Sequence, residues 1–249
     1  MALPTLAFFD LAGCEGCQLQ IANMGETLLA LLKKVQLVEF REISSERWTG
    51  PLALAVVEGS VVTAEAGQRL REIRERSGLL IALGSCAVTG GLNGLKNRQR
   101  PEEVQRSVYG DQPCFVATSA VRPLQQIVKV DYQVPGCPIF PEEFVKVIKA
   151  ALAGLPCPVP DYAVCVECKF NENVCRYDKG VTCLGPITRA GCNSWCINHG
   201  NTCYGCRGKV SNPNCAGASE VLSRYGLDAD RLLEKMCMYD AAAGGGDDD

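Results

Sequence analysis

The chain has 249 residues, of which 47% are hydrophobic and 21% charged, and its formal net charge is −3. These values are those of an ordinary globular protein with one large domain or two unequal ones. The sequence has no basic stripe, and no apolar run approaches the roughly 20 residues that cross a bilayer. We therefore expect neither a nucleic-acid partner nor a direct membrane span.

Strands and helices are predicted to alternate along the first part of the chain. Residues 5–10 (TLAFFD) form a compact apolar strand, and apolar residues at helical spacing predict one helix over 18–34. Further strands are predicted at 35–40, 52–57, 79–83 and 127–134, and further helices around 66–73 and at 142–152. This alternation predicts an α/β fold, a parallel sheet with helices on both faces. The polar segment 91–113 is predicted to be an insertion or a surface loop.

The composition changes at residues 155–160 (LPCPVP), which predicts a domain boundary. Beyond Cys215, short helices from Ser219 and Asp228 are expected to close a smaller domain. The last nine residues, AAAGGGDDD, are expected to be disordered. The predicted division is therefore 1–155, 156–240 and a tail at 241–249.

Cysteine is unusually frequent, with 16 residues in the chain. The N-terminus carries no basic region ahead of its short apolar run, so we expect a cytoplasmic protein. In a reducing compartment, many cysteines indicate bound metal, whereas in an exported protein a disulfide framework would compete.

Eight of the cysteines fall within the 42 residues from Cys165 to Cys206. They form two groups of four: Cys165, Cys168, Cys175 and Cys183, then Cys192, Cys196, Cys203 and Cys206. Apolar residues are too few here to bury a core, so cross-links must supply stability. Four thiolates suit either an Fe–S cluster or a tetrahedral zinc ion, and the spacing alone does not separate the two.

Four other cysteines follow predicted strands of the sheet. Cys14 and Cys17 follow the first strand, Cys86 a later one, and Cys137 the last. The carboxyl ends of parallel strands border one crevice, so these thiols are expected to meet. A CxxC pair alone also fits a thioredoxin-like dithiol, but that reading requires neither Cys86 nor Cys137.

Several motifs together resemble the small, electron-transferring subunit of [NiFe] hydrogenases. They are GCEGCQL, VVEGS, LGSCAVTGG, VDYQVPGCPIFPE and CLGPITRAGC…CYGCRG, and the resemblance extends over roughly residues 5–210. The cytosolic multimeric branch is most similar, with its sulfhydrogenase (NAD(P)-linked) and F420- or heterodisulfide-linked enzymes. The resemblance implies a flavodoxin-like, doubly wound domain with a proximal cluster, followed by a small irregular Fe–S cluster domain with a medial and a distal cluster.

The resemblance also implies a role for each motif cysteine. Cys14, Cys17, Cys86 and Cys137 match the proximal ligands; Cys192, Cys196, Cys203 and Cys206 the medial ones; Cys165, Cys168, Cys175 and Cys183 the distal ones. Many relatives hold a medial [3Fe–4S] cluster on three cysteines, and Cys196 adds a fourth ligand here. Cys165 stands where the membrane-linked branch has a histidine. Three [4Fe–4S] clusters are therefore expected.

The implied chemistry lies mainly in partner chains. H–H cleavage belongs to a nickel–iron centre on the large subunit, so this chain has no catalytic acid, base or nucleophile to name. A flavin, FAD or FMN, is expected on a diaphorase-type partner that reduces NAD(P), with F420 and heterodisulfide systems as open alternatives. The large-subunit interface is predicted around Cys14, Glu15, Glu58, Cys86 and Cys137.

Three other interpretations compete with a hydrogenase subunit. The cluster-bearing subunit of the respiratory NADH–quinone enzyme resembles the first domain but has adjacent cysteines in place of Cys14-Glu15-Gly16-Cys17 and lacks the eight-cysteine tail. A zinc-stapled interaction module and a stand-alone ferredoxin-like carrier are the remaining alternatives.

Some polar and sulfur-containing side chains keep open roles. Glu15 and Glu58 either pass protons, orient the large subunit, or act as surface or capping carboxylates. His199 is expected to hydrogen-bond near a cluster or to be exposed rather than to bind iron. Cys114, Cys157, Cys215 and Cys237 are expected to be free thiols, although Cys215 could exchange with a neighbouring ligand.

Overall fold

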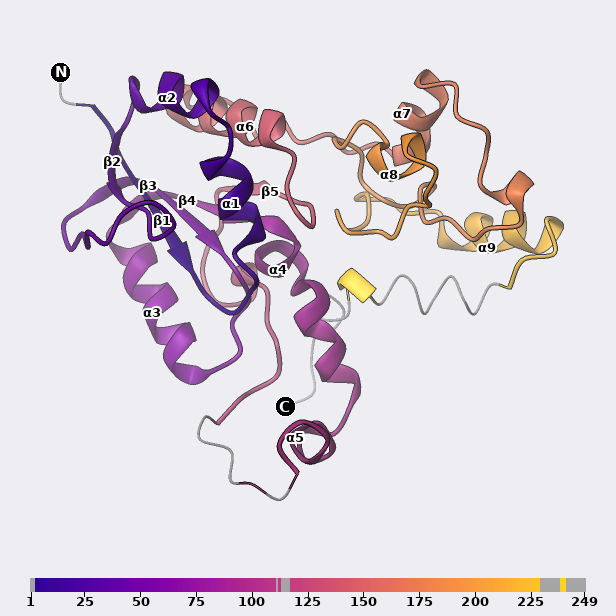
Figure 1. Ribbon diagram of the computed structural model, residues 1–249, viewed down its shortest axis with the longest axis horizontal. Helices are drawn as coiled ribbons and strands as arrows, with labels where there is room; N and C mark the ends of the chain where they lie inside the picture. Colours follow the sequence, from indigo (N-terminus) through magenta and orange to yellow (C-terminus); the bar gives the residue numbers. More distant parts are fainter. Residues whose placement is uncertain (1–2, 111, 113–116, 229–237, 241–249) are drawn as a thin grey trace.

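Figure 1 shows the computed structural model of the chain, which describes residues 3–110, 112, 117–228 and 238–240. The predicted tail at 241–249, Cys114 and Cys237 lie outside these residues, as does nearly all of the helix predicted from Asp228. Within the described part of the chain, no helix is both long and apolar enough to cross a membrane.

Residues 5–134 contain a five-stranded, all-parallel sheet. Its strands are β1 (Thr5–Asp10), β2 (Gln36–Glu39), β3 (Leu52–Glu58), β4 (Ser77–Leu83) and β5 (Tyr132–Val134). Their spatial order is β2-β1-β3-β4-β5, and every neighbouring pair is parallel. The order reverses between β1 and β3, which is where open α/β sheets collect ligands beyond the carboxyl ends of their strands. The predicted flavodoxin-like α/β fold is confirmed.

Helices cover both faces of the sheet (Figure 1). One face carries α1 (Gly16–Ala22), α2 (Glu26–Leu32) and α6 (Pro141–Ala153), and the other carries α3 (Ala64–Glu75) and α4 (Gly84–Thr89). Because side chains alternate along a strand, Leu6 and Phe8 of β1 enter one core while Ala7 and Phe9 enter the other. The Phe8 ring stacks on Phe40 at a centroid distance of 4.3 Å. This two-sided burial explains why β1 is apolar from Leu6 to Phe9.

Two predicted elements differ from those observed. The helix expected over 18–34 is broken between α1 and α2, where Gly25 has φ +57° and ends the regular path. The strand expected over 127–134 is shorter, because the Asp131 carboxylate accepts the Leu80 N–H at 2.9 Å just before β5 begins. A short 3₁₀ turn, η2 (Leu124–Gln126), precedes this strand.

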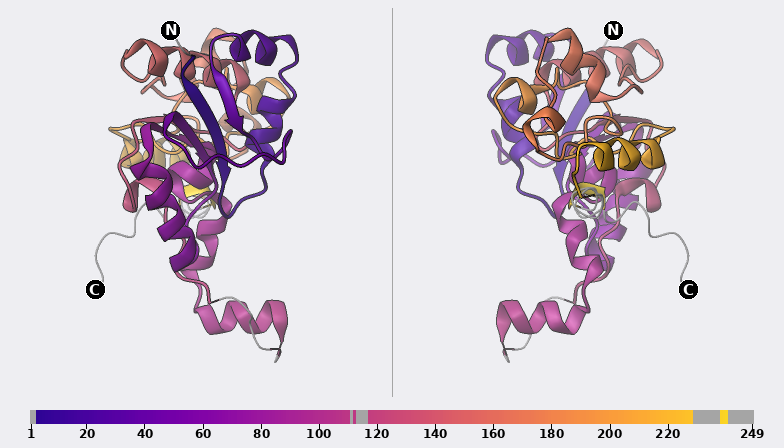
Figure 2. Two further views of the ribbon diagram at one scale, coloured as in Figure 1. Left: turned by 90° about the vertical axis from the view of Figure 1, so that its left-hand side faces the viewer. Right: turned by 90° about the vertical axis from the view of Figure 1, so that its right-hand side faces the viewer.

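The polar segment after α4 forms a helical arm rather than a loop. It contains η1 (Gly91–Arg98), a 3₁₀ helix, and α5 (Pro101–Tyr109). Figure 2 shows α5 projecting from the body of the molecule, and none of its residues is buried.

The part of the chain that follows α6 forms a small lobe beside the sheet (Figure 1). Its elements are α7 (Val164–Phe170), η3 (Tyr177–Lys179), α8 (Trp195–Asn198) and α9 (Cys215–Arg224), joined by long irregular segments. A small core of Val164, Leu184, Ile187, Leu222 and several cysteines packs inside it. The sheet elements end at Ala153 and the lobe elements begin at Val164, so we propose residues 1–155 and 156–240 as the two domains.

Candidate metal centres

The four thiols predicted as proximal ligands lie at the carboxyl edge of the sheet. Cys14 and Cys17 flank the start of α1, Cys86 lies in α4, and Cys137 follows β5. The Cys137 thiol lies close enough to the other three thiols to interact with them electrostatically. The thiols of Cys86 and Cys14 interact in the same way. The structure therefore brings together residues that are up to 123 positions apart in the sequence.

Glycines make room for these sulfurs. Gly84 has φ +80°, and a Cβ atom there would lie 2.5 Å from Cys17 Sγ. Gly91 has φ +56°, and its Cβ would lie 2.9 Å from Cys86 Sγ. Both backbone conformations favour glycine, so the chain leaves space beside each thiol that any side chain would fill.

The environment of these thiols fits a metal-bound state. Burial raises the pKa of the Cys17 thiol, and the Glu58 carboxylate raises it further. Burial and the charge of Cys137 raise the pKa of Cys86 to about 12. Iron binds thiolates, and a cationic iron centre compensates for the cost of deprotonating buried thiols. The donor set, its glycine-lined space and its need for positive charge all fit an Fe–S cluster.

Glu58 anchors the loop that carries Cys17. Its side chain is 3% exposed, and its two carboxylate oxygens accept the N–H groups of Cys17 at 3.1 Å and Gln18 at 2.9 Å. This satisfies two N–H groups of the first turn of α1, which have no partner within the helix. Of the roles left open by the sequence, the geometry fits a capping carboxylate. Glu15, at φ +60°, precedes the same helix.

The four thiols predicted as distal ligands also gather in one place. The Cys165 thiol lies close enough to the thiols of Cys183, Cys168 and Cys175 to interact with them electrostatically. Burial raises the pKa of Cys165 to about 12. Gly185 lies between two of them, since its Cβ would be 3.2 Å from Cys165 Sγ and 3.5 Å from Cys183 Sγ. Cys175 is exposed, so this group reaches the protein surface.

The group predicted to bind the medial cluster lies between the other two. The Cys206 thiol lies close enough to the thiols of Cys192 and Cys196 to interact with them electrostatically. Burial raises the pKa of Cys206 to about 12. The Cys203 thiol lies near both Cys206 and Cys183, and the Cys183 sulfur, which belongs to the group predicted to bind the distal cluster, accepts the Cys203 N–H at 3.4 Å. Cys203 thus connects the two groups of the lobe.

Glu167 is a further residue of this region, which the sequence analysis does not single out. It stands between Cys165 and Cys168 on α7, yet its carboxylate accepts the N–H groups of Gly191 at 2.7 Å and Ser194 at 3.0 Å. It therefore holds the loop of Cys192 against the distal helix. The only signal in the sequence is an acidic residue inside a CxxC motif, which does not indicate its partners.

Tyr239 is a second residue that sequence reasoning misses. Its hydroxyl hydrogen-bonds the Cys137 thiol, and Thr89 donates to its backbone carbonyl. Burial, followed by the charge of Cys137, raises the pKa of Tyr239 to about 12. A lone tyrosine near the C-terminus carries no signal that it returns to residues 137 and 89.

The remaining candidates lie beside the cysteine groups without completing them. His199 is exposed, its Nδ1 atom lies 2.8 Å from the Trp195 carbonyl, and its ring packs on Trp195 at 4.0 Å. Cys157 is exposed, and Cys215 begins α9 and packs against the lobe core.

A zinc ion would need four sulfurs about 2.3 Å from one point. Among the described side chains, no three His, Cys, Asp or Glu groups converge in the way a single metal ion requires.

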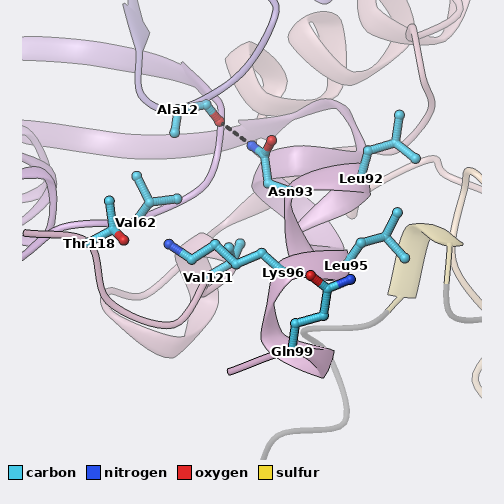
Figure 3. A pocket seen from close by; sticks show the side chains of 9 residues that line it. All are labelled: Ala12, Val62, Leu92, Asn93, Leu95, Lys96, Gln99, Thr118 and Val121. Carbon is cyan, nitrogen blue, oxygen red and sulfur yellow. Dashed lines mark hydrogen bonds between the residues drawn. The ribbon is translucent and has the colours of Figure 1, made fainter. Parts of the chain in front are cut away.

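A shallow pocket of 520 Å³ adjoins the proximal loop (Figure 3). Asn93 of η1 donates to the Ala12 carbonyl at 2.8 Å and to Ser60 Oγ at 2.9 Å, which fixes the arm beside the loop that leads to Cys14. Leu92 and Leu95 lie at one side of the pocket, exposed by 44% and 39%. Two exposed leucines therefore border the pocket beside the loop that leads to Cys14.

Comparisons with known proteins place this geometry in a family. The family model described as NADH ubiquinone oxidoreductase, 20 Kd subunit, matches residues 14–151. Sulfhydrogenase 2 subunit delta of Pyrococcus furiosus is 38% identical over 232 residues, which cover 93% of this chain and 97% of that protein. A vhu subunit of the F420-non-reducing hydrogenase of Methanococcus voltae is 32% identical, with coverage of 94% and 93%.

A solved structure gives a similar result for part of the chain. The crystal structure of an NAD⁺-reducing [NiFe]-hydrogenase in the H2-reduced state contains a chain that matches with a TM-score of 0.56 and 30% identity. The match covers 96% of that chain but 64% of this one. The two relatives above cover nearly the whole of this chain, so the similarity to them extends into the lobe.

Proposed function

Because the chain belongs to the [NiFe] hydrogenase small subunits within the 20 kDa subunit family, we propose that it relays electrons between a nickel–iron site and a diaphorase-type partner. As a hydrogenase subunit it serves an oxidoreductase that acts on H2, and the active site lies on the large subunit. The observation that carries the relay is the arrangement of twelve thiols as three neighbouring groups of four.

The proposed ligand groups follow one another without a gap. The backbone N–H of the proximal residue Cys137 hydrogen-bonds the sulfur of the medial residue Cys206. The medial residue Cys203 donates its N–H to the sulfur of the distal residue Cys183 at 3.4 Å. Three [4Fe–4S] clusters would supply the one-electron redox chemistry, while this chain holds them in series and shields them by burial. We propose that the complex works in the cytoplasm.

The hydrogenase large subunit pairs with this chain, and we propose that it covers the proximal crevice. Cys14 is exposed there, and Leu92 and Leu95 extend the apolar surface along the arm. Interfaces that persist through the life of a complex are apolar at their centre, which these leucines would supply.

Cys196→Ser tests the proposed medial cluster. Removing one of four thiolates is expected to leave a [3Fe–4S] cluster, so the iron content of the chain falls from about twelve to about eleven. EPR of the oxidised protein should then show the [3Fe–4S] signal that the unchanged chain lacks. Cys157→Ser is the matched control, because Cys157 lies outside the three groups and should change neither quantity. An unchanged iron content in Cys196→Ser would remove Cys196 from the ligands.

The diaphorase-type partner, with its FAD or FMN, is proposed to dock where the distal group reaches the surface. The Phe170 side chain, two residues after Cys168, is 84% exposed, and Val174, beside the exposed Cys175, is 59% exposed. Large apolar side chains exposed this far are typical of interaction sites when they lie together. Their position would bring the partner to the end of the relay.

Phe170→Asp is expected to impair this docking. In the purified complex, the rate of H2-dependent reduction of the natural acceptor should fall about tenfold or more, as for the loss of an apolar anchor at an interface. Reduction of a small soluble viologen dye should stay unchanged, because the dye needs no docking surface. Val108→Asp, on α5 and 65% exposed, is the control. Equal loss with the acceptor and with the dye would contradict the proposed docking site.

A further inference from the structure

Arg207 is a buried cation at the junction of the lobe and the sheet domain. It directly follows the medial residue Cys206, and its side chain is 1% exposed. Its guanidinium donates to the Glu143 carboxylate, 2.7 Å from Oε1 and 2.8 Å from Oε2, and to the Pro135 carbonyl at 2.6 Å. Its Nε atom donates to the Ala190 carbonyl at 2.9 Å. One side chain therefore joins residues 135–143 of the sheet domain to the loop of the lobe that contains Ala190.

Each of these two segments carries a proposed cluster ligand. Pro135 comes two residues before the proximal residue Cys137, and Ala190 comes two residues before the medial residue Cys192. Glu143 lies in the first turn of α6, which begins at Pro141, four residues after Cys137. The guanidinium thus fixes the medial loops against the loop that carries a proximal ligand.

The surrounding backbone leaves space for this contact. Gly191 has φ +117°, and a Cβ atom there would overlap both Arg207 Nη2 and Glu143 Oε1. Beside the ion pair, the Cys137 N–H hydrogen-bonds the Cys206 sulfur, and the Ser85 hydroxyl donates to the Cys206 carbonyl. The most direct bridge between the proximal and medial groups therefore lies next to the guanidinium.

Stability alone does not account for a buried ion pair. Apolar residues of similar volume often replace such pairs at no cost in stability. Apolar residues do not replace the planar guanidinium group of arginine, whose N–H groups donate in several fixed directions at once. Here these N–H groups donate to acceptors in both domains.

We propose that Arg207 is a positioning residue for electron transfer between the proximal and medial sites, with Glu143 as its anchor. It rests on the proposed function, since it assumes that both sites hold clusters. With clusters bound at both sites, an electron passing between them would oxidise one and reduce the other, and no bond would be made or broken. The role of the guanidinium is to keep Cys137 and Cys206 in contact across the domain junction.

The test compares Arg207→Met/Glu143→Leu with the unchanged protein in the purified hydrogenase complex. The double variant removes both charges, so neither is left buried alone. EPR of the reduced complex should show a weaker magnetic interaction between the proximal and medial clusters at unchanged iron content. H2-driven reduction of the medial cluster, followed by rapid freezing, should slow about 10- to 100-fold, as for other residues that position metal ligands.

Two further variants make the result specific. Arg189→Met removes an ion pair of the same lobe, Arg189 Nη1 to Asp161 Oδ1 at 2.7 Å, and should change neither readout. Arg207→Lys keeps the charge but loses the planar guanidinium group, so it should keep its clusters and still show the weaker interaction. If the double variant does not fold, Arg207→Lys alone decides the question.

The outcomes separate this inference from the proposed function. If the complex without substitutions contains far fewer than about twelve irons per chain, the proposed relay itself is refuted. A complete set of clusters with unchanged interaction and unchanged medial reduction in the double variant, or in Arg207→Lys where only that variant folds, would overturn the role of Arg207 and leave the relay intact.

Discussion

Gly84→Ala is expected to prevent assembly of the proximal cluster. Gly84 has φ +80°, a conformation that costs a non-glycine residue about 1–3 kcal/mol. The new methyl group would lie 2.5 Å from Cys17 Sγ and 3.5 Å from the Gly136 carbonyl oxygen. Cys17 is only 6% exposed and belongs to the core beneath α1, so its sulfur has no free space into which it can retreat. Either the thiol is displaced or the end of β4 shifts, and both break the proximal group.

The measurement is iron content together with the midpoint of thermal unfolding. The variant should lose about four of about twelve irons per chain, since one [4Fe–4S] cluster is lost. Its unfolding midpoint should fall as well. Gly67→Ala is the matched control: Gly67 lies within α3, where the nearest atom to a new Cβ is Val61 Cγ1 at 3.6 Å. That change should stabilise the helix by about 0.5–1 kcal/mol. Full iron in Gly84→Ala would contradict the proposed proximal site.

Glu58→Ala is expected to destabilise the same site from the other side. The substitution leaves the N–H groups of Cys17 and Gln18 without their acceptors in a buried position. Each unsatisfied group costs about 1–3 kcal/mol. The start of α1 should loosen, and with it the position of Cys17. We expect a lower unfolding midpoint and partial loss of iron.

Glu58→Gln separates charge from hydrogen bonding. Its amide oxygen can accept one of the two N–H groups, so the loss of stability should be smaller than for alanine. Removing a negative charge beside Cys17 favours the more reduced cluster, so the proximal reduction potential should rise. Glu39→Gln is the control, because this buried carboxylate accepts the Trp48 N–H at 3.0 Å at the end of β2, an edge strand. An equal rise in potential for Glu39→Gln would refute the local effect.

The parts of the fold that follow from short-range pattern are predictable from the sequence. β1 is apolar from Leu6 to Phe9 because both of its faces are covered, and this two-sided pattern indicates a buried parallel strand. Cys86 and Cys137 follow strands in the sequence, and in a parallel sheet that alone brings them to one edge.

Other features depend on contacts that the sequence does not encode locally. The break at Gly25 is hidden because α1 and α2 pack on the same face, so the apolar spacing continues across it. Arg207 reads as an ordinary surface arginine, and its partner Glu143 lies 64 positions away. The start of β5 is set by the side chain of Asp131, whose carboxylate accepts the Leu80 N–H in place of a backbone carbonyl. Each of these requires the three-dimensional structure.

The most direct test of the electron relay is the metal content of the full chain purified without oxygen. We predict about twelve irons and about twelve acid-labile sulfides per chain, without zinc, because each of the three proposed groups of four thiolates would hold a [4Fe–4S] cluster. EPR of the reduced sample should show interacting [4Fe–4S] centres. About two zinc ions per chain and little iron would contradict the relay and leave a zinc-stapled interaction module.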